Sequence, residues 1–128
     1  MEFYKYANVD IDVDRLQEIV TIHNLTQLCN SIYDIIQDDI TKGKIYCIWG
    51  HFKINKEIIK NGVRFTLPNC PNALAWTITK ERVGESDKIL IHCTINKSEH
   101  EPDFIQSIEQ FVSDWKIGLE SYYARVFN

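Results

Sequence analysis

The sequence predicts an α+β fold in which a four-stranded antiparallel sheet is covered on one face by helices. Residues 44–95 carry apolar side chains at alternating positions, which is the period of strands with one face on a core. Residues 25–40 and residues 102–126 instead repeat their apolar side chains every three or four positions, which is the helical period. Strands grouped together, with helices before and after them, are typical of the α+β class.

The chain is expected to form one domain over residues 1–128, because a second core would leave each half too small to bury enough apolar surface. Its composition, with 45% hydrophobic and 25% charged residues, is that of an ordinary globular protein. No apolar stretch approaches the ~20 residues that a membrane-spanning helix needs, and the first residues do not resemble a signal peptide. We therefore expect a cytoplasmic protein with no membrane partner.

The N-terminal part combines an additional edge strand with helical segments. Residues 2–9 partly alternate apolar and polar side chains, which favours a strand. Asp14 has the position of a helix N-cap, and Asn24 marks a break because the apolar stripe changes phase there. The main N-terminal helix is then expected over residues 25–40. Residues 18–23 stay open between helix and strand, because several of them are β-branched.

The predicted sheet begins with a long strand followed by a hairpin. Asn61 and Gly62 form a strong turn signal, and residues 55–60 make the hairpin loop longer than minimal. Two prolines after residue 67 interrupt the ladder, because proline has no N–H to donate. A polar connection over residues 80–88 precedes the last strand. The four expected strands are 44–54, 63–67, 74–79 and 89–95.

The C-terminal segment predicts a long amphipathic helix that covers the sheet. Pro102 suits the first turn, and the acidic residues around it favour the positive end of the helix dipole. Apolar side chains then share one stripe, with polar side chains on the opposite side. Phe111 and Trp115 are the expected core anchors of this stripe.

The net charge of −4 hides an uneven distribution. Residues 1–41 hold two basic and eight acidic side chains, whereas residues 42–97 hold ten basic and four acidic ones. Residues 98–128 are again acidic, with two basic and six acidic side chains. Charge asymmetry of this kind bears on binding partners more than on fold, so the basic middle segment indicates where an anionic ligand would bind.

Motifs for common catalytic and cofactor sites are absent from the sequence. The five glycines are isolated, which excludes the dinucleotide and P-loop patterns. Asp10, Asp12 and Asp14 have the opening spacing of a calcium loop, but Arg15 occupies the position where the loop needs glycine. The four cysteines are scattered and form no C-x-x-C pair, so we expect free thiols, no metal and no cofactor.

A small enzyme remains a lesser hypothesis. Cys70 lies between two prolines on a loop, so it is the cysteine most exposed to a substrate, and His51 or His92 would have to lie beside it to act as a base. Such proximity depends on the tertiary structure. The absence of a motif makes a non-catalytic protein the favoured interpretation.

The predicted sheet has a second face that points away from the helices, and this face is the candidate binding surface. It combines an aromatic residue with basic side chains and a row of threonines, a composition that suits an anionic ligand, a stacked base or a partner subunit. The alternative is a solvated face, because threonine is also common in strands for packing reasons. The side chains assigned to this face are Trp49, His51, Lys53, Arg64, Thr66, Thr77, Thr79, His92 and Thr94.

These observations favour a small binding or regulatory protein that acts through self-association or through another protein. The alternative hypothesis is an anionic small molecule or single-stranded nucleic acid bound on the basic sheet. In that case Trp49 stacks on a base, and Arg64 or Lys53 contacts phosphate. Trp49 and Arg64 are expected to be neighbours on the open face, since the turn at residues 61–62 would pair their strands.

Overall fold

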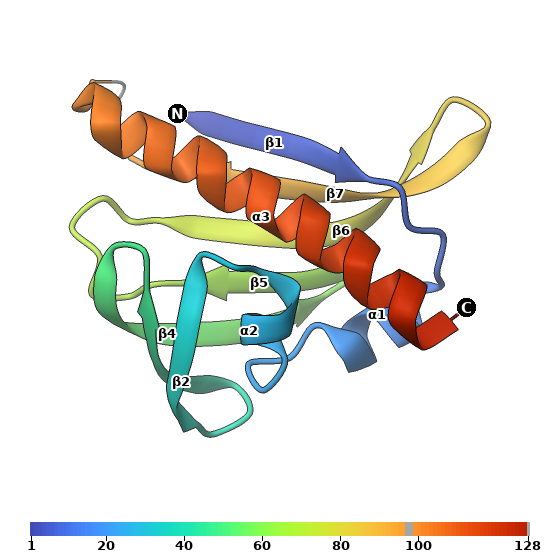
Figure 1. Ribbon diagram of the computed structural model, residues 1–128, viewed down its shortest axis with the longest axis horizontal. Helices are drawn as coiled ribbons and strands as arrows, with labels where there is room; N and C mark the ends of the chain where they lie inside the picture. The colour runs from blue at the N-terminus through green and yellow to red at the C-terminus, as the bar shows by residue number, and fades with distance from the viewer. Residues whose placement is uncertain (97–98, 128) are drawn as a thin grey trace.

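The computed structural model describes residues 1–96 and 99–127, which form one antiparallel sheet wrapped around a long helix (Figure 1). The seven strands follow the order β1-β7-β6-β5-β4-β3-β2. None of the helices in the described residues is both long and apolar enough to span a membrane. The elements are β1 (Glu2–Ala7), α1 (Val13–Ile19), α2 (Leu25–Leu28), β2 (Ile32–Asp38), β3 (Lys42–Cys47), β4 (Gly50–Ile59), β5 (Gly62–Thr66), β6 (Ala75–Val83), β7 (Ser86–Thr94) and α3 (Pro102–Phe127).

The four-stranded sheet expected from the sequence is therefore wrong, since the sheet has seven strands. The largest error concerns residues 25–40, where α2 is a single turn and β2 is an edge strand. Two register irregularities in β2 explain the error. Ile32 pairs with Cys47 and Ile35 with Ile45, so consecutive core-facing residues are three positions apart instead of two. A strand with bulges can therefore imitate the helical spacing of apolar residues.

The expected first strand, 44–54, is in fact two strands joined by a tight turn. Ile48 and Trp49 form this turn, and Gly50 has the positive φ of 109° that such a reversal needs. The turn changes the phase of the alternation. Alternation along an uninterrupted strand would place Tyr46 on the core side with Phe52, but Tyr46 pairs with His51 and lies on the opposite face.

The other hairpins are also tighter than expected. Residues 55–60 belong to β4 up to Ile59, which pairs directly with Gly62, so the long loop predicted there does not exist. The predicted connection over residues 80–88 is mostly strand, with β6 and β7 paired as far as Val83 and Ser86. Gly84 makes that turn with a φ of 63°.

The N-terminal helices are short. Asp12, and not Asp14, caps α1 by accepting a hydrogen bond from the Arg15 N–H at 2.8 Å. Residues 18–23 are neither a continuous helix nor a strand, because α1 ends at Ile19 and a turn leads to α2.

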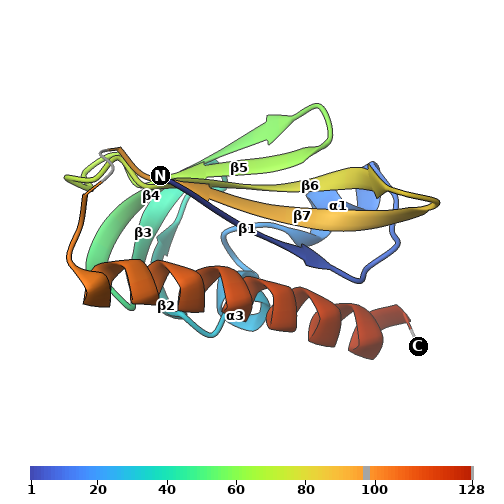
Figure 2. The ribbon, with the colours of Figure 1, turned by 90° about the horizontal axis from the view of Figure 1, so that it is seen from above.

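Helix α3 lies along one face of the sheet, which we call the inner face (Figure 2). Its Phe111 and Trp115 are buried, as expected from the apolar stripe. They join Phe65 and Trp76 of the sheet in one aromatic cluster, with ring centroids 4.9 Å apart for Trp76 and Phe111 and 6.2 Å apart for Phe65 and Trp115. This cluster fills the space between α3 and the sheet.

Candidate functional site

The space between α3 and the sheet is filled by the aromatic cluster, and a small hollow lies beside it. The hollow between the β1–α1 segment and the C-terminal half of α3 has a volume of about 10 Å³, which is roughly the space of one water molecule. Its lining is apolar or aromatic: Val9, Ile11, Leu16, Ile19, Leu119, Tyr122 and Tyr123. Four larger hollows open on the opposite face of the sheet.

We call that opposite face the outer face, and it carries no helix among the described residues. It displays side chains of all seven strands to solvent. Five of the large apolar side chains that are exposed lie on it, and four of them are tyrosines. They are Tyr4, Tyr6, Tyr33, Ile36 and Tyr46.

Trp49 is not on the outer face, contrary to the expectation from alternation. It lies in the β3–β4 turn and packs on α3, with its ring centroid 4.9 Å from that of Phe111 and 6.3 Å from that of Phe104. Its indole Nε1–H donates a hydrogen bond to Ser107 Oγ at 2.8 Å. The expected Trp49–Arg64 neighbourhood is therefore wrong, and the residue that pairs with Arg64 on β4 is Glu57.

Three of the other predicted binding residues do form one row on the outer face. Arg64 pairs with Thr77, and Thr77 pairs with His92 on the next strand. The row continues to Tyr4 on β1. A hollow of about 340 Å³ lies over this row, and His92 also lines a neighbouring hollow of about 400 Å³ with Tyr4.

The charges of this row are partly compensated. His92 Nε2 lies 2.9 Å from Glu2 Oε1, so the imidazole already has a carboxylate as its partner. Thr66 lies one row away, opposite Ala75, and Thr79 is nearly buried. The β1–β7–β6–β5 half of the outer face thus carries the Arg64 guanidinium, the His92–Glu2 pair and, farther along the strands, Glu81 paired with Lys88.

The other half, over β2, β3 and β4, carries three lysines near one another. Lys44 and Lys53 are directly paired on neighbouring strands, and Lys42 is two residues before Lys44 on the same face. All three are exposed, and none lies within ion-pair distance of a carboxylate in the part of the chain that the structure describes. We call these three residues the lysine cluster.

An aromatic row borders the lysine cluster. We use this name for Tyr33, Tyr46 and His51, whose rings contact one another across β2, β3 and β4. The ring centroids of Tyr46 and His51 are 4.6 Å apart with planes inclined by 32°, and those of Tyr33 and Tyr46 are 5.6 Å apart. Neither tyrosine was among the expected binding residues, because Tyr33 lies within the expected helix over residues 25–40 and alternation along an uninterrupted strand 44–54 would place Tyr46 on the core side.

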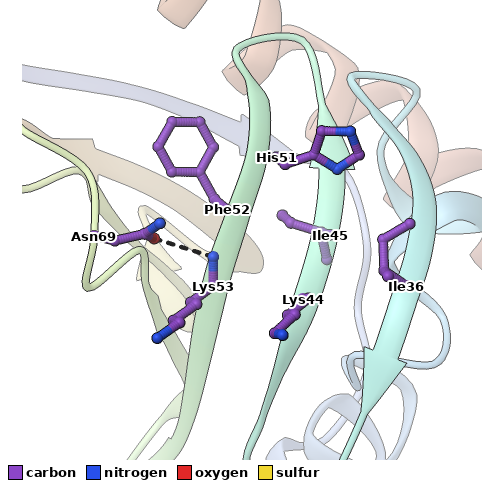
Figure 3. A pocket seen from close by; sticks show the side chains of 7 residues that line it. All are labelled: Ile36, Lys44, Ile45, His51, Phe52, Lys53 and Asn69. Carbon is purple, nitrogen blue, oxygen red and sulfur yellow. Dashed lines mark hydrogen bonds between the residues drawn. The ribbon is translucent and has the colours of Figure 1, made fainter.

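Two adjoining hollows open over this half of the outer face, with volumes of about 230 and 220 Å³. Both are lined by Lys44 and Lys53, whose side chains extend in the same direction from neighbouring strands (Figure 3). Asn69, from the loop after β5, closes one side by accepting a hydrogen bond from the Lys53 N–H at 3.0 Å. Loop and strands thus form a shallow polar depression with an apolar floor.

The arrangement does not favour the catalytic hypothesis. His51 lies on β4 and His92 on β7, which are separated by β5 and β6 and hence by about 14 Å across the sheet. Cys70 is half-buried, and burial raises the pKa of the other three thiols, Cys29, Cys47 and Cys93, the last to about 12. Within residues 1–96 and 99–127, no three His, Cys, Asp or Glu side chains are grouped for a metal ion.

Comparison with solved structures defines the class of fold. A START superfamily protein from Mycobacterium smegmatis matches with a TM-score of 0.71 and 10% identity, over 98% of each chain. The protein XoxI from Bacillus cereus matches with a TM-score of 0.70 and 12% identity, over 99% of this chain and 98% of that one. The chain therefore has a START-like fold. No protein-family model and no curated protein matches the sequence.

Proposed function

We propose that this protein is a non-catalytic binding protein that takes an anionic ligand on the lysine cluster of the outer face. The observation that supports the proposal most is the direct cross-strand pairing of Lys44 with Lys53. Like charges in directly opposite positions of a sheet destabilise it. An anion lying between the two ammonium groups would convert this repulsion into two charge-assisted hydrogen bonds.

The shape of the molecule supports the outer face as the binding surface. The interior hollow of about 10 Å³ is too small for an organic ligand, whereas the two hollows over the lysine cluster together offer several hundred Å³. They are shallow and open, which suits a ligand with charged groups that remain partly hydrated. Asp39 lies at the rim of the second hollow, and its carboxylate would repel a phosphate that extended toward β2.

Tripolyphosphate is a suitable first probe, because it supplies charge without any other recognition feature. We expect binding, measured by calorimetry, to weaken steeply as salt is raised. Replacing both residues, as Lys44→Gln with Lys53→Gln, should reduce the affinity by about a hundredfold or more, since each lost charged hydrogen bond costs about 1.5–3 kcal/mol. Lys60→Gln is the matched control, because Lys60 is an exposed lysine in the β4–β5 turn outside the cluster.

A second readout does not require any ligand. The single variant Lys44→Gln removes the like-charge pair and should raise the free energy of unfolding by about 0.2–1 kcal/mol at low salt. Unchanged tripolyphosphate affinity in the double variant, or affinity lost equally in the Lys60→Gln control, would contradict the proposal.

Self-association is the second candidate function, and it has its own supporting observation at the other end of the outer face. Tyr4 is 63% exposed and lies edge-on to Tyr6, beside the hollow of about 400 Å³ that Leu90 also lines. Tyrosine is enriched at protein interfaces. Sedimentation of the parent protein and of Tyr4→Ser with Tyr6→Ser tests this candidate, and a parent that sediments as a monomer at high concentration excludes it.

A further inference from the structure

We infer that the ligand of the lysine cluster is a nucleoside phosphate, whose base stacks on the aromatic row while its phosphate lies between Lys44 and Lys53. This inference rests on the anion-binding function proposed above and adds the chemical class of the ligand. Its basis is the position of the aromatic row beside the lysines on the same uncovered face.

The rings of the aromatic row are available to a ligand. Tyr33 is 53% and Tyr46 41% exposed, and His51 is exposed beside them. Exposed aromatic rings are costly to leave in water, and every base offers a flat π-face that can cover them. With centroids 4.6 Å apart and planes inclined by 32°, the Tyr46 and His51 rings partly stack on each other, and a base would extend this short stack across β3 and β4.

On both β3 and β4, a lysine lies two residues from an aromatic side chain on the same face. On β3, Tyr46 follows Lys44 by two residues, and on β4, Lys53 follows His51 by two residues. Two residues of extended strand span about 6.6 Å. The pairs Tyr46–His51 and Lys44–Lys53 thus form two parallel rows that a base and its own phosphate can occupy together.

Asp34 of β2 favours one direction in which such a ligand would lie. Asp34 pairs with Tyr46, so a carboxylate borders the aromatic row. Gln37, which is neutral, pairs with Lys44. A phosphate would be repelled from the Asp34 side and attracted to the lysine side, whereas a neutral base would be tolerated beside Asp34.

The test compares a phosphate chain without a base with two ligands that carry bases. Binding of a labelled short oligothymidylate is measured by fluorescence anisotropy, with thymidine 5′-monophosphate and tripolyphosphate as competitors. Tyr46→Thr keeps strand propensity but removes the ring, and it should weaken oligothymidylate binding by about tenfold or more while leaving tripolyphosphate binding unchanged. Tyr46→Phe should retain the affinity, because stacking requires only the ring.

Ile58→Thr is the matched control, since Ile58 is an apolar β4 residue that is 58% exposed and lies outside the aromatic row and the lysine cluster. Strong competition by the monophosphate would identify a free nucleotide as the ligand, and strong binding of the oligonucleotide alone would identify a single strand. If tripolyphosphate binds at the lysines but neither base-containing ligand responds to Tyr46→Thr, this inference is wrong and the proposed function stands. If tripolyphosphate does not bind either, both fail.

Discussion

At the scale of single residues, Trp49 illustrates how one turn decides between a core role and a surface role. Alternation along an uninterrupted strand placed it opposite Phe52, on the open face. The β3–β4 turn instead directs its ring toward α3, where it contacts Phe104 and Phe111. Ser107 accepts its indole hydrogen bond and in turn donates to the Phe104 carbonyl. Trp49 therefore fastens the first turns of α3 to the sheet.

Replacing Trp49 with Thr should lower the free energy of unfolding by about 2–4 kcal/mol, because the variant loses aromatic burial and leaves a cavity beside Phe111. Chemical denaturation measures the change. Tyr33→Thr is the control, because Tyr33 is 53% exposed and should alter stability by less than about 1 kcal/mol. A Trp49 variant as stable as the parent would show that the turn does not anchor α3.

At the scale of elements, the crossing of α3 over α2 depends on Gly118. A Cβ atom built on Gly118 would lie 1.9 Å from the Leu28 carbonyl oxygen and 2.4 Å from its carbon. Both are backbone atoms, so no side chain can move aside to relieve the overlap. The glycine allows the end of α2 to lie directly on the helix and brings Cys29 into the core, with its Sγ–H donating toward the Phe111 carbonyl.

Two opposing effects meet in the variant Gly118→Ala. Helix propensity alone would stabilise α3 by about 1 kcal/mol, because glycine is unfavourable inside a helix. The overlap with Leu28 should outweigh this gain, and we expect a net loss of about 2–3 kcal/mol in chemical denaturation. Ile117→Ala, at the 57% exposed neighbouring position, should be nearly neutral. Stabilisation by Gly118→Ala would mean that α2 does not lie this close to α3.

At the scale of the whole molecule, a contact between distant parts of the chain joins the N-terminal strand to the last helix. Glu120 Oε2 accepts hydrogen bonds from the Asn8 N–H at 2.8 Å and from Lys116 Nζ at 2.7 Å. Partial burial raises the pKa of this carboxyl, but the hydrogen bonds from Lys116 and Asn8 and the charge of Lys116 outweigh it, so the pKa is lowered overall. The contact holds the segment after β1 against α3.

The lowered pKa of Glu120 predicts a pH-dependent contribution to stability. A group whose pKa is lower in the folded protein stabilises it above the pKa of the unfolded chain, and this contribution disappears as the pH falls through the folded value. Glu120→Gln should therefore cost up to about 1 kcal/mol near neutral pH, and the difference from the parent should shrink in acid.

Denaturation of both proteins over the acidic and neutral range measures this dependence. Glu109→Gln is the control, since Glu109 is exposed on the same helix and makes no hydrogen bond or ion pair in the described residues. If Glu120→Gln lowered the free energy of unfolding by the same amount at low pH, the effect would come from packing and not from the charge of the carboxylate.

The local sequence determined the elements whose pattern is regular and whose signals lie within a few residues. The α3 stripe with Phe111 and Trp115, the turn at residues 61–62 and the alternation of β5 to β7 follow from side-chain period and turn chemistry alone. Arg64, Thr77 and His92 were placed on one face by the same alternation, and the structure brings them together.

The tertiary structure decided everything that depends on pairing between strands. The bulges of β2 and the tight β3–β4 turn shift the phase of apolar residues, and only the partner strands reveal that shift. For this reason the pairing of Lys44 with Lys53, and the contact of Tyr33 with Tyr46, could not be predicted. Cross-strand neighbours are set by register, which a single strand's sequence does not contain.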